Sequence, residues 1–415
     1  MRPSGAGERV RLAFVVSHPV QYYVPLYRRL AQREDISIKV FYTWHQGATA
    51  VNDSGFERAI QWDVPLVDGY DHELVPNEAR RQGTHRFLGL RNPSLVDRLL
   101  DWNPDVVHVT GYAWLAHLLC LRTLHRRRIP VLFRGDSHLL DEPRRGARWW
   151  MKRAALYTVY SWPAVCLYVG QANKAYYKAF GVPAGRLRYC PHSIDTGRFC
   201  EPAERLESEA RAWRDELGLN KGQLVLLYAG KFEHKKRPLE LMRAVREFAP
   251  AHVTLVMVGA GELETEVRAL AARNPERFYV LPFQNQSRMP LVYRIGDLCI
   301  LPSGHGETWG LAVNEALACG RPVIVSDKVG CAADLVERDC GWVFPSEDWR
   351  ELGRILHEAA QGAERLFSMR VAARSKAHTF EVRTTEQCLV DAIRQLTGRR
   401  CSNTSALPDG KVVSG

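Results

Sequence analysis

The chain has 415 residues, of which 46% are hydrophobic and 25% are charged, a balance typical of a globular protein and not of a disordered one. This length exceeds what one ordinary core accommodates, so two domains are expected. No apolar run reaches the length of a signal-peptide core or a membrane span, and the cysteines lie in apolar surroundings without zinc spacing. These features predict a cytoplasmic protein with reduced thiols.

The net charge of +11 is concentrated in the first half of the chain. Residues 1–195 contain 27 Lys and Arg against 17 Asp and Glu, whereas the remaining residues contain 30 against 29. We therefore expect the first half to meet an anionic partner, with a solvated basic surface as the alternative. The sequence does not indicate nucleic acid, because it has no zinc-finger spacing, RNA-binding aromatic motif or basic-zipper pattern.

Strand-like runs of Val, Ile and Leu alternate with helical patterns along the chain. In the first half this pattern predicts strands at 10–17, 36–44, 105–111, 130–135 and 164–170, with helices at 24–33 and 114–128. In the second half it predicts strands at 224–230, 252–259, 298–303 and 322–326, helices at 238–249, 262–274 and 311–318, and a long C-terminal helical stretch. Such alternation is typical of parallel sheets covered on both faces, and it predicts an α/β fold of two doubly wound, Rossmann-like domains.

The domain change-over is predicted within 191–222. We expect an N-terminal acceptor-binding domain at 1–194 and a C-terminal donor-binding domain at 195–397, with the last helix free to pack back on the first domain. Residues 398–415 have a turn-forming composition that predicts a disordered tail. Ligands of facing doubly wound domains bind at the carboxyl ends of the strands, where the distinctive motifs of this chain occur, so one cleft is expected to collect them.

A basic loop, GKFEHKKRP, follows the strand at 224–230. It contains Lys231 and Lys236 ahead of Pro238, which is suited to the first position of a helix. Cations at a helix entrance are unfavourable unless an anion is bound, so the loop predicts an anion site, with exposed lysines as the alternative. The incomplete glycine pattern VGAG argues only weakly for a nicotinamide, and no cofactor is predicted.

The segment GHGETWGLAVNEALACG contains two glutamates, Glu307 and Glu315, around a run of small and apolar residues. Glycines before the helix allow the backbone to approach a ligand, and the helix N-terminus can take a diphosphate on the amides near Trp309, Gly310 and Leu311. Glu315 can accept hydrogen bonds from a ribose diol, and Glu307 can reach the hydroxyls of a sugar beyond the phosphate. For Glu315 the alternative is an ordinary exposed helix residue.

This segment resembles the E-x7-E motif of retaining glycosyltransferases of the GT-B fold, family 4, and the similarity covers roughly residues 9–396. A bacterial branch associated with surface-polysaccharide and glycoconjugate assembly has segments similar to HPVQYY, WDVPLVDGY, FRGDSH, PHSID, GKFEHKKRP, LPFQNQSRMP and LPSGHGETWGLAVNEA. The resemblance implies transfer of a sugar, with retention, from a nucleotide-sugar donor to a glycan or lipid-linked acceptor. Uridine is the family's usual base.

The resemblance also implies residue roles on the donor side. Glu315 matches the glutamate that holds the ribose, and Glu307 the one that faces the donor sugar. Lys231 and Lys236 match the basic pair that binds the diphosphate, and Phe283 and Gln284 match the segment beside the base. Where the family usually has a glycine after the second lysine this chain has Arg237, which predicts a different pocket edge.

On the acceptor side the resemblance is less specific. It places His18 near the phosphates or the acceptor. For the family histidine that contacts the sugar, His138 is the favoured residue and Asp136 the second choice, with a structural capping role as the alternative for either.

The sequence contains no D-x-D motif, the carboxylate pair with which other sugar transferases bind Mg²⁺ or Mn²⁺. No metal is therefore predicted, and the lysines and the helix end are expected to neutralise the leaving diphosphate. The resemblance implies front-face attack in which the leaving phosphate oxygen takes the acceptor's proton. The site then mainly positions the reactants and stabilises the departing charge.

The segment EPRRGARWWMKRAALYTVYSW combines cations with large apolar side chains. The residues concerned are Arg144, Arg145, Arg148, Lys152 and Arg153 beside Trp149, Trp150 and Met151. This combination suits an anionic membrane surface, here the inner face, or a lipid-linked acceptor. The alternative is a helix that packs its aromatic residues into its own domain.

Two other functions remain open at this point. A GT-B sugar-nucleotide 2-epimerase shares the fold, although its acid/base carboxylates do not correspond to the E-x7-E arrangement. A catalytically silent GT-B subunit that positions a partner transferase is the non-enzyme alternative. Product analysis distinguishes the first, and donor hydrolysis by the isolated chain argues against the second.

Overall fold

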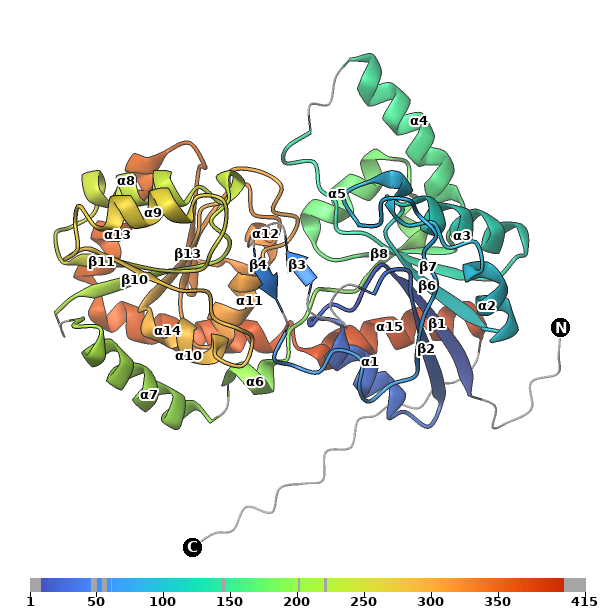
Figure 1. The fold of residues 1–415 in the computed structure, drawn as a ribbon, viewed down its shortest axis with the longest axis horizontal. Helices are drawn as coiled ribbons and strands as arrows, with labels where there is room; N and C mark the ends of the chain where they lie inside the picture. Colours follow the sequence, from blue (N-terminus) through green and yellow to red (C-terminus); the bar gives the residue numbers. More distant parts are fainter. Residues whose placement is uncertain are drawn as a thin grey trace, which may run out of the picture.

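The computed structural model describes residues 9–45, 51–53, 58–60, 62–142, 146–200, 202–219 and 222–398. They form two α/β units, each built on a parallel sheet, with helices on both faces of each sheet (Figure 1). The prediction of two doubly wound, Rossmann-like domains is confirmed.

The N-terminal sheet has seven parallel strands in the order β5-β2-β1-β6-β7-β8-β9. The strands are β1 (Val10–Val16), β2 (Ile36–Tyr42), β5 (His72–Leu74), β6 (Val106–Thr110), β7 (Val131–Arg134), β8 (Val165–Tyr168) and β9 (Leu187–Tyr189). A separate antiparallel hairpin is formed by β3 (Val51–Asp53) and β4 (Arg58–Ile60). The strand order reverses between β1 and β6, which is where a ligand crevice is expected.

Helices cover both faces of this sheet and bury two separate clusters of apolar side chains. The elements are α1 (Val24–Ala31), α2 (Leu95–Asp101), α3 (Leu115–Arg126), α4 (Ala147–Ser161), α5 (Gln171–Ala179) and the short 3-10 helices η1 (Phe87–Gly89) and η2 (Ala184–Arg186). Phe14 belongs to the cluster beneath α1, and Phe133 to the cluster beneath α3 and α5. Because both faces are covered, the strands are apolar almost throughout, as the sequence pattern indicated.

The last helix, α15 (Val382–Thr397), returns to the N-terminal sheet after the chain has completed the other domain (Figure 1). It packs against α1, β6 and β9 and buries Leu389, Val390 and Ile393 in the cluster beneath α1. Its Glu386 accepts ion pairs from Arg29 at 2.6 Å and Arg33 at 3.2 Å. The two domains are therefore joined by two crossings of the chain.

The C-terminal sheet has six parallel strands in the order β12-β11-β10-β13-β14-β15. The strands are β10 (Leu224–Ala229), β11 (Val253–Val258), β12 (Phe278–Leu281), β13 (Leu298–Leu301), β14 (Val323–Ser326) and β15 (Gly341–Phe344). The helices are α6 (Thr196–Cys200), α7 (Ala203–Glu216), η3 (His234–Lys236), α8 (Pro238–Phe248), α9 (Glu264–Ala271), α10 (Met289–Ile295), α11 (Leu311–Ala318), α12 (Ala332–Leu335), α13 (Trp349–Gln361) and α14 (Ala363–His378). The order reverses between β10 and β13, so this sheet also opens a crevice at its carboxyl end.

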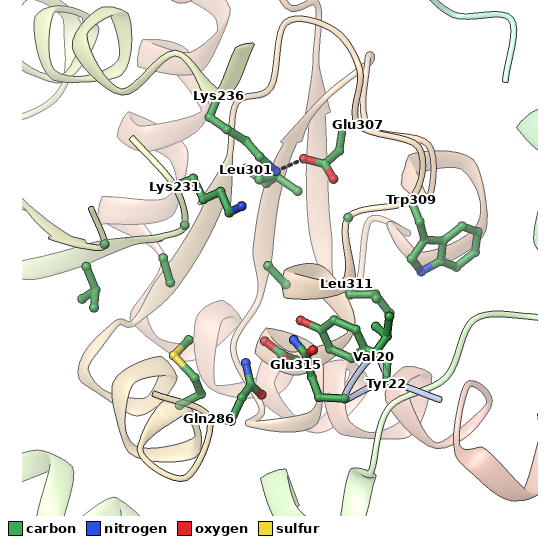
Figure 2. A pocket seen from close by; sticks show the side chains of 18 of the residues that line it. Val20, Tyr22, Lys231, Lys236, Gln286, Leu301, Glu307, Trp309, Leu311 and Glu315 are labelled. Atoms are coloured by element: carbon green, nitrogen blue, oxygen red, sulfur yellow. Dashed lines mark hydrogen bonds and ion pairs between the residues drawn. The ribbon is translucent and has the colours of Figure 1, made fainter. Parts of the chain in front are cut away.

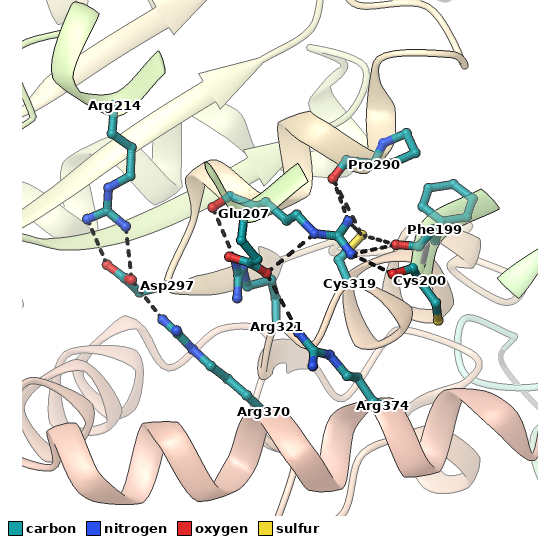
Figure 3. A network of polar contacts seen from close by, with 11 residues as sticks. Phe199, Cys200, Glu207, Arg214, Pro290, Asp297, Cys319, Arg321, Arg370 and Arg374 are labelled. Carbon is teal, nitrogen blue, oxygen red and sulfur yellow. Dashed lines mark hydrogen bonds and ion pairs between the residues drawn. The ribbon is translucent and has the colours of Figure 1, made fainter. Parts of the chain in front are cut away.

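Two acidic residues gather arginines around the helices that support this crevice (Figure 3). Glu207 of α7 pairs with Arg294, Arg321 and Arg374 at 3.4, 2.6 and 3.7 Å, and Asp297 pairs with Arg214 and Arg370 at 3.0 and 3.1 Å. The buried Arg294 also donates to the carbonyl oxygen of Pro290. A buried guanidinium needs such partners, because an unpaired buried charge is costly. The network fixes α10 to α7 and α14 behind the crevice.

Three sequence predictions concern the remainder of the chain. Within the described ranges no helix combines the length and the apolar character needed to cross a bilayer. Cysteines at 120, 166, 190, 299, 319, 331 and 340 are buried thiols. The predicted disordered tail lies, apart from Gly398, outside the described residues.

Candidate functional site

A cavity of about 570 Å³ lies between the two domains, at the carboxyl ends of the strands in both sheets. The C-terminal domain contributes the loops after β10, β11, β12 and β13 and residues of α10 and α11. The N-terminal domain contributes the loops after β1, β7 and β9 and the residue Trp62. The volume is in the range typical of ligand pockets, and the cavity lies at the strand ends where the sequence analysis expected a cleft.

The start of α11 forms the centre of the C-terminal wall. Gly310 has φ of +96°, and a Cβ there would lie 2.9 Å from the side chains of both Leu301 and Val329, so the position requires glycine. The helix begins at the next residue, Leu311, as the sequence predicted. Trp309 donates through Nε1 to Asn314 Oδ1 at 2.8 Å, which fixes its ring. Val313 N–H donates to Gly310 O at 2.9 Å, and the N–H groups before it in the first turn can donate to an anion.

Glu315 lies one turn into α11 and is only 2% exposed. Tyr293 donates to its Oε2 at 2.6 Å, while Oε1 is buried without a hydrogen-bond partner. Burial raises the pKa of Glu315 to about 7, although the hydroxyl of Tyr293, the charge of Arg198 and the hydroxyl of Tyr22 lower it. The interpretation of Glu315 as an ordinary exposed helix residue is therefore wrong. An unsatisfied buried acceptor in a cavity wall indicates a ligand that donates hydrogen bonds.

The lysines of the basic loop and Glu307 line the same wall (Figure 2). Lys236 forms an ion pair with the Glu307 carboxylate, which also accepts from Ser303 Oγ at 3.0 Å. Lys231 projects into the cavity beside them (Figure 2). The structure thus brings together the residues that the sequence assigned to a diphosphate and to a sugar.

Arg237 stands where the family usually has a glycine, and its backbone has a conformation that glycine adopts easily. Its φ is +54°, in the left-handed region that favours glycine. Its guanidinium points away from the cavity, where it donates to Ser346 O at 2.6 Å and pairs with Glu347 at 2.5 Å. It passes over Gly304, where a Cβ would lie 2.1 Å from Arg237 Nε. Arg237 itself does not line the cavity, and the different pocket edge stays a prediction.

Phe283 and Gln284 line one end of the cavity, where the N-terminal domain also contributes. The ring centroids of Trp62 and Phe283 lie 6.5 Å apart across the cleft. The neighbouring Asp63 accepts from the backbone N–H of Ser287 at 3.1 Å and also from its hydroxyl. The sequence did not single out Trp62, although it lies in the quoted segment WDVPLVDGY.

The loop after β1 reaches the cavity with residues that follow His18, not with His18 itself. Gln21, Tyr22 and Tyr23 line the wall. His18 is not among the lining residues, its Nδ1 lies 2.9 Å from Ser17 Oγ, and its ring packs near another aromatic side chain. The motif HPVQYY thus belongs to the site, but through its second half.

The two candidates after β7 occupy different places. Asp136 lines the cavity and accepts from Thr308 Oγ1 at 3.0 Å. His138, the favoured candidate, does not line it: its Nε2 lies 3.1 Å from the backbone oxygen of Glu307. Asp136, the second choice of the sequence analysis, therefore lies at the cavity, whereas His138, the first choice, contacts a backbone oxygen outside it.

His192, which the sequence analysis did not select, lines the cavity from the loop after β9. Arg134 can only donate, so its contact of 3.2 Å makes His192 Nδ1 the acceptor and leaves the proton on Nε2, which is buried without a partner. Burial and the charge of Arg134 hold the pKa of His192 well below its usual value, so the ring is neutral. The motif PHSID, quoted for its resemblance, was the available signal.

Two further motifs have structural explanations. Gly259 of VGAG packs against the preceding loop, since a Cβ there would lie 1.9 Å from Gly230 O. This close approach accounts for the glycine without a nicotinamide. Among the described residues, no group of three or more His, Cys, Asp or Glu side chains is arranged to hold a metal ion.

Comparisons with known proteins agree with this geometry. Residues 20–198 match the family "Glycosyltransferase Family 4", and residues 209–376 match "Glycosyl transferases group 1". A D-inositol 3-phosphate glycosyltransferase of Xylanimonas cellulosilytica is 28% identical over 233 residues, 54% of this chain and 54% of that protein. The chain thus spans about half the length of the curated relatives it matches.

Solved structures show the same fold at low sequence identity. HepE of Anabaena, solved with UDP, has a TM-score of 0.69 and 18% identity over 93% of this chain and 100% of that one. A glycosyltransferase from Rickettsia africae has a TM-score of 0.71 and 13% identity over 94% and 100%. Two family models that match residues 20–198 and 209–376 show that the chain belongs to the glycosyltransferases, with a family 4 domain followed by a group 1 domain, and the solved structures show the GT-B fold.

Proposed function

We propose that this enzyme transfers a sugar, with retention of configuration, from a nucleotide-sugar donor to a glycan or lipid-linked acceptor without a metal ion. The observation that carries the proposal is the C-terminal wall. There the buried Glu315 carboxylate with an unsatisfied oxygen, the N-terminus of α11, Lys231, Lys236 and the Glu307 carboxylate line one cavity. This sequence of groups matches the order ribose, diphosphate, sugar in a nucleotide-sugar.

The donor is proposed to lie along α11. The ribose hydroxyls donate to Glu315, and the diphosphate meets Lys231, Lys236 and the first amides of the helix. The sugar then extends toward Glu307 and Asp136, and the base lies at the Phe283 end. A uridine base is supported by HepE, which was solved in complex with UDP-glucose.

In this arrangement the residues stabilise a leaving group and supply no nucleophile. The charges of Lys231 and Lys236 and the amides of α11 stabilise the negative charge that develops on the departing diphosphate. The acceptor hydroxyl attacks on the face that the diphosphate leaves, and its proton passes to the leaving phosphate oxygen. The protein's contribution is orientation and preorganised charge.

The acceptor is proposed to approach from the N-terminal domain, with α4 against an anionic membrane at its inner face. Trp150, Met151 and Tyr157 of α4 are 61%, 67% and 62% exposed, whereas Trp149 packs on Phe180 at 5.0 Å. Figure 1 shows α4 standing out from the domain. Of the cations noted in the sequence, Arg148, Lys152 and Arg153 lie on α4, while Arg144 and Arg145 lie outside the described residues.

A thermal-shift panel of nucleotide sugars tests the donor assignment, and NMR of the anomeric configuration of the product tests retention. We expect stabilisation by one nucleotide sugar and by its diphosphate, followed by glycoside formation that continues in EDTA. Free 2-epimerised sugar nucleotide in place of a glycoside supports the epimerase instead. Absence of both transfer and donor hydrolysis supports a silent subunit.

Flotation with neutral and anionic liposomes tests the membrane contact. The double variant Trp150→Ser/Met151→Ser should lose most of its binding to anionic vesicles, because it removes the apolar insertion while the cations remain. The matched control is Phe367→Ser/Val371→Ser on α14, where the side chains are 70% and 64% exposed in the other domain. Equal recovery of wild type on both lipids contradicts the proposal.

A further inference from the structure

Three consecutive residues before α11 are held by side chains of the other domain. The backbone N–H of Gly306 donates to Asp141 Oδ2 at 2.7 Å, and Thr308 Oγ1 donates to Asp136 Oδ2 at 3.0 Å. Between them, the backbone oxygen of Glu307 lies 3.1 Å from His138 Nε2. All three partners belong to the N-terminal segment 136–141, which follows β7.

A fourth contact joins the same segment to the loop after β14. Lys328 Nζ donates to the backbone oxygen of Leu140 at 2.8 Å. We call the segment 136–141, with its contacts to Gly306, Glu307, Thr308 and Lys328, the clasp.

The hydrogen bonds of His138 define its tautomer. Its Nδ1 accepts from the backbone N–H of Leu140 at 3.2 Å, so the proton of the neutral ring is on Nε2. Nε2 therefore donates to Glu307 O, which also accepts from the backbone N–H of Gly330 at 3.0 Å. His138 is 7% exposed and does not line the cavity. Both of its nitrogens are thus committed to backbone groups.

We propose that the clasp positions Glu307 in the donor site, with His138 as a positioning residue that acts through the backbone of Glu307 and not through contact with the sugar. This inference rests on the proposed function, because it assigns Glu307 to the donor sugar. It makes the placement of the sugar-facing carboxylate depend on closure of the two domains.

The C-terminal domain holds the Glu307 carboxylate, and the clasp adds contacts to the backbone that carries it. Within this domain the Glu307 carboxylate pairs with Lys236 and accepts from Ser303 Oγ at 3.0 Å. The loop backbone is held by Gly304 N–H to Lys235 O at 2.8 Å, Gly330 N–H to Glu307 O at 3.0 Å and Cys331 N–H to Trp309 O at 2.9 Å. The ribose end differs, because none of the four clasp contacts is to Glu315, which accepts from Tyr293 of its own domain and lies beside Tyr22 of the other. Nucleotide binding should therefore tolerate loss of the clasp, whereas sugar placement should not.

The first experiment compares Asp141→Ala and His138→Ala with wild type. Asp141 is exposed and outside the cavity, so its variant is expected to fold. The affinity for UDP, measured by calorimetry, should change by less than about twofold, while turnover of the nucleotide sugar that wild type binds should fall about tenfold, as for loss of a hydrogen bond to a charged or buried group. Asp215→Ala and His125→Ala, on exposed helix surfaces, are the matched controls.

A double-mutant cycle then separates positioning from direct contact. In the background Glu307→Gln, His138→Ala should have little additional effect on turnover, because both changes act on one group. His138→Gln should restore much of the turnover, since its amide can donate to Glu307 O. Additive losses in the cycle, or equal weakening of UDP and nucleotide-sugar binding, overturn the proposal.

Scattering in the absence of ligand gives a readout that needs no donor. Asp141→Ala should increase the radius of gyration relative to wild type and to Asp215→Ala, and an unchanged radius contradicts a clasp that holds the domains. If wild type binds no nucleotide sugar in the panel, the proposed function fails first. If wild type binds and the clasp variants match it in turnover, only the clasp fails.

Discussion

The two walls of the cleft differ in the sequence distance between each lining residue and the residues that hold it in place. On the C-terminal wall, Lys231, Lys236, Glu307, Glu315, Phe283, Gln284, Trp309, Gly310 and Leu311 all line the cavity, as the sequence assigned them. On the N-terminal wall neither assigned histidine does, and the lining residues there include Tyr22, Trp62, Asp136 and His192.

The difference follows from sequence separation. Glu307 and Glu315 are placed by one strand end, one glycine turn and one helix, so their spacing along the chain determines their spacing in the fold. His138 and Asp136 are placed by partners about 170 positions away in the other domain. A short motif specifies the first kind of wall, and closure of two domains specifies the second.

The largest effect is expected from the lysines of the C-terminal wall. Lys236→Ala removes a preorganised charge near the diphosphate and also frees the Glu307 carboxylate, so turnover should fall about 10²-fold or more. Steady-state kinetics with and without EDTA measure this, with Lys178→Ala on the exposed surface of α5 as control. If chelation abolishes wild-type turnover and Mg²⁺ restores it, the C-terminal wall does not neutralise the diphosphate by itself.

Glu315→Gln should weaken UDP binding about tenfold or more, because a charged acceptor for the ribose is lost. Burial raises the pKa of Glu315 from 4.5 to about 7, so the folded protein keeps a proton there that the unfolded chain loses, and this group's contribution to stability falls as the pH rises from 4.5 to about 7. Ribose hydroxyls favour the ionised carboxylate. Binding should therefore release a proton below about pH 7, and affinity should rise with pH.

Calorimetry at about pH 6.5 in two buffers of different ionisation enthalpy counts the released proton. The count should be positive for wild type and near zero for Glu315→Gln. The assignment of Glu315 to the ribose is wrong if the variant binds UDP as tightly as wild type, or if the UDP affinity of wild type does not change with pH. The C-terminal wall would then lose the residue on which its comparison with the other wall mainly rests.

The smallest effect concerns the contact between the walls at the base end. Asp63→Ala removes hydrogen bonds to Ser287 that are exposed to water, so we expect a loss of about threefold to tenfold in UDP affinity. Trp62, which lies opposite Phe283, should become more mobile, and its fluorescence should respond less to UDP. Ser287→Ala is the matched partner variant, and an affinity equal to wild type in both contradicts coupling at this end.

The fold was more accessible from the sequence than the site. Helix α11 was predicted at the residues it occupies, because a glycine turn precedes it and Gly320 follows it. The edge strands β5, β9, β12 and β15 were not predicted, because sequences such as HEL of β5 and LRY of β9 lack the continuous Val, Ile and Leu run of the central strands. The left-handed backbone conformation of Arg237 was also not predicted, although the sequence analysis noted that the family usually has a glycine at this position.

For the candidate site, residue type and spacing identified groups that chemistry requires, such as carboxylates and lysines after strands. They did not distinguish a histidine with both nitrogens bonded, His138, from one with a free Nε2, His192. That distinction depends on partners such as Arg134 and the backbone of Glu307, which no local pattern encodes. The same limit applies to Tyr22 beside Glu315.

The return of α15 to the first sheet has a consequence for synthesis on the ribosome. The apolar face formed by α1, β6 and β9 stays uncovered while the whole second domain is translated, because its covering helix is the last one described. The C-terminal sheet has its helices earlier and can fold as soon as α14 emerges. The half made first therefore completes its core last, and a nascent chain arrested before residue 382 carries a finished C-terminal sheet beside an exposed apolar surface of the kind that chaperones bind.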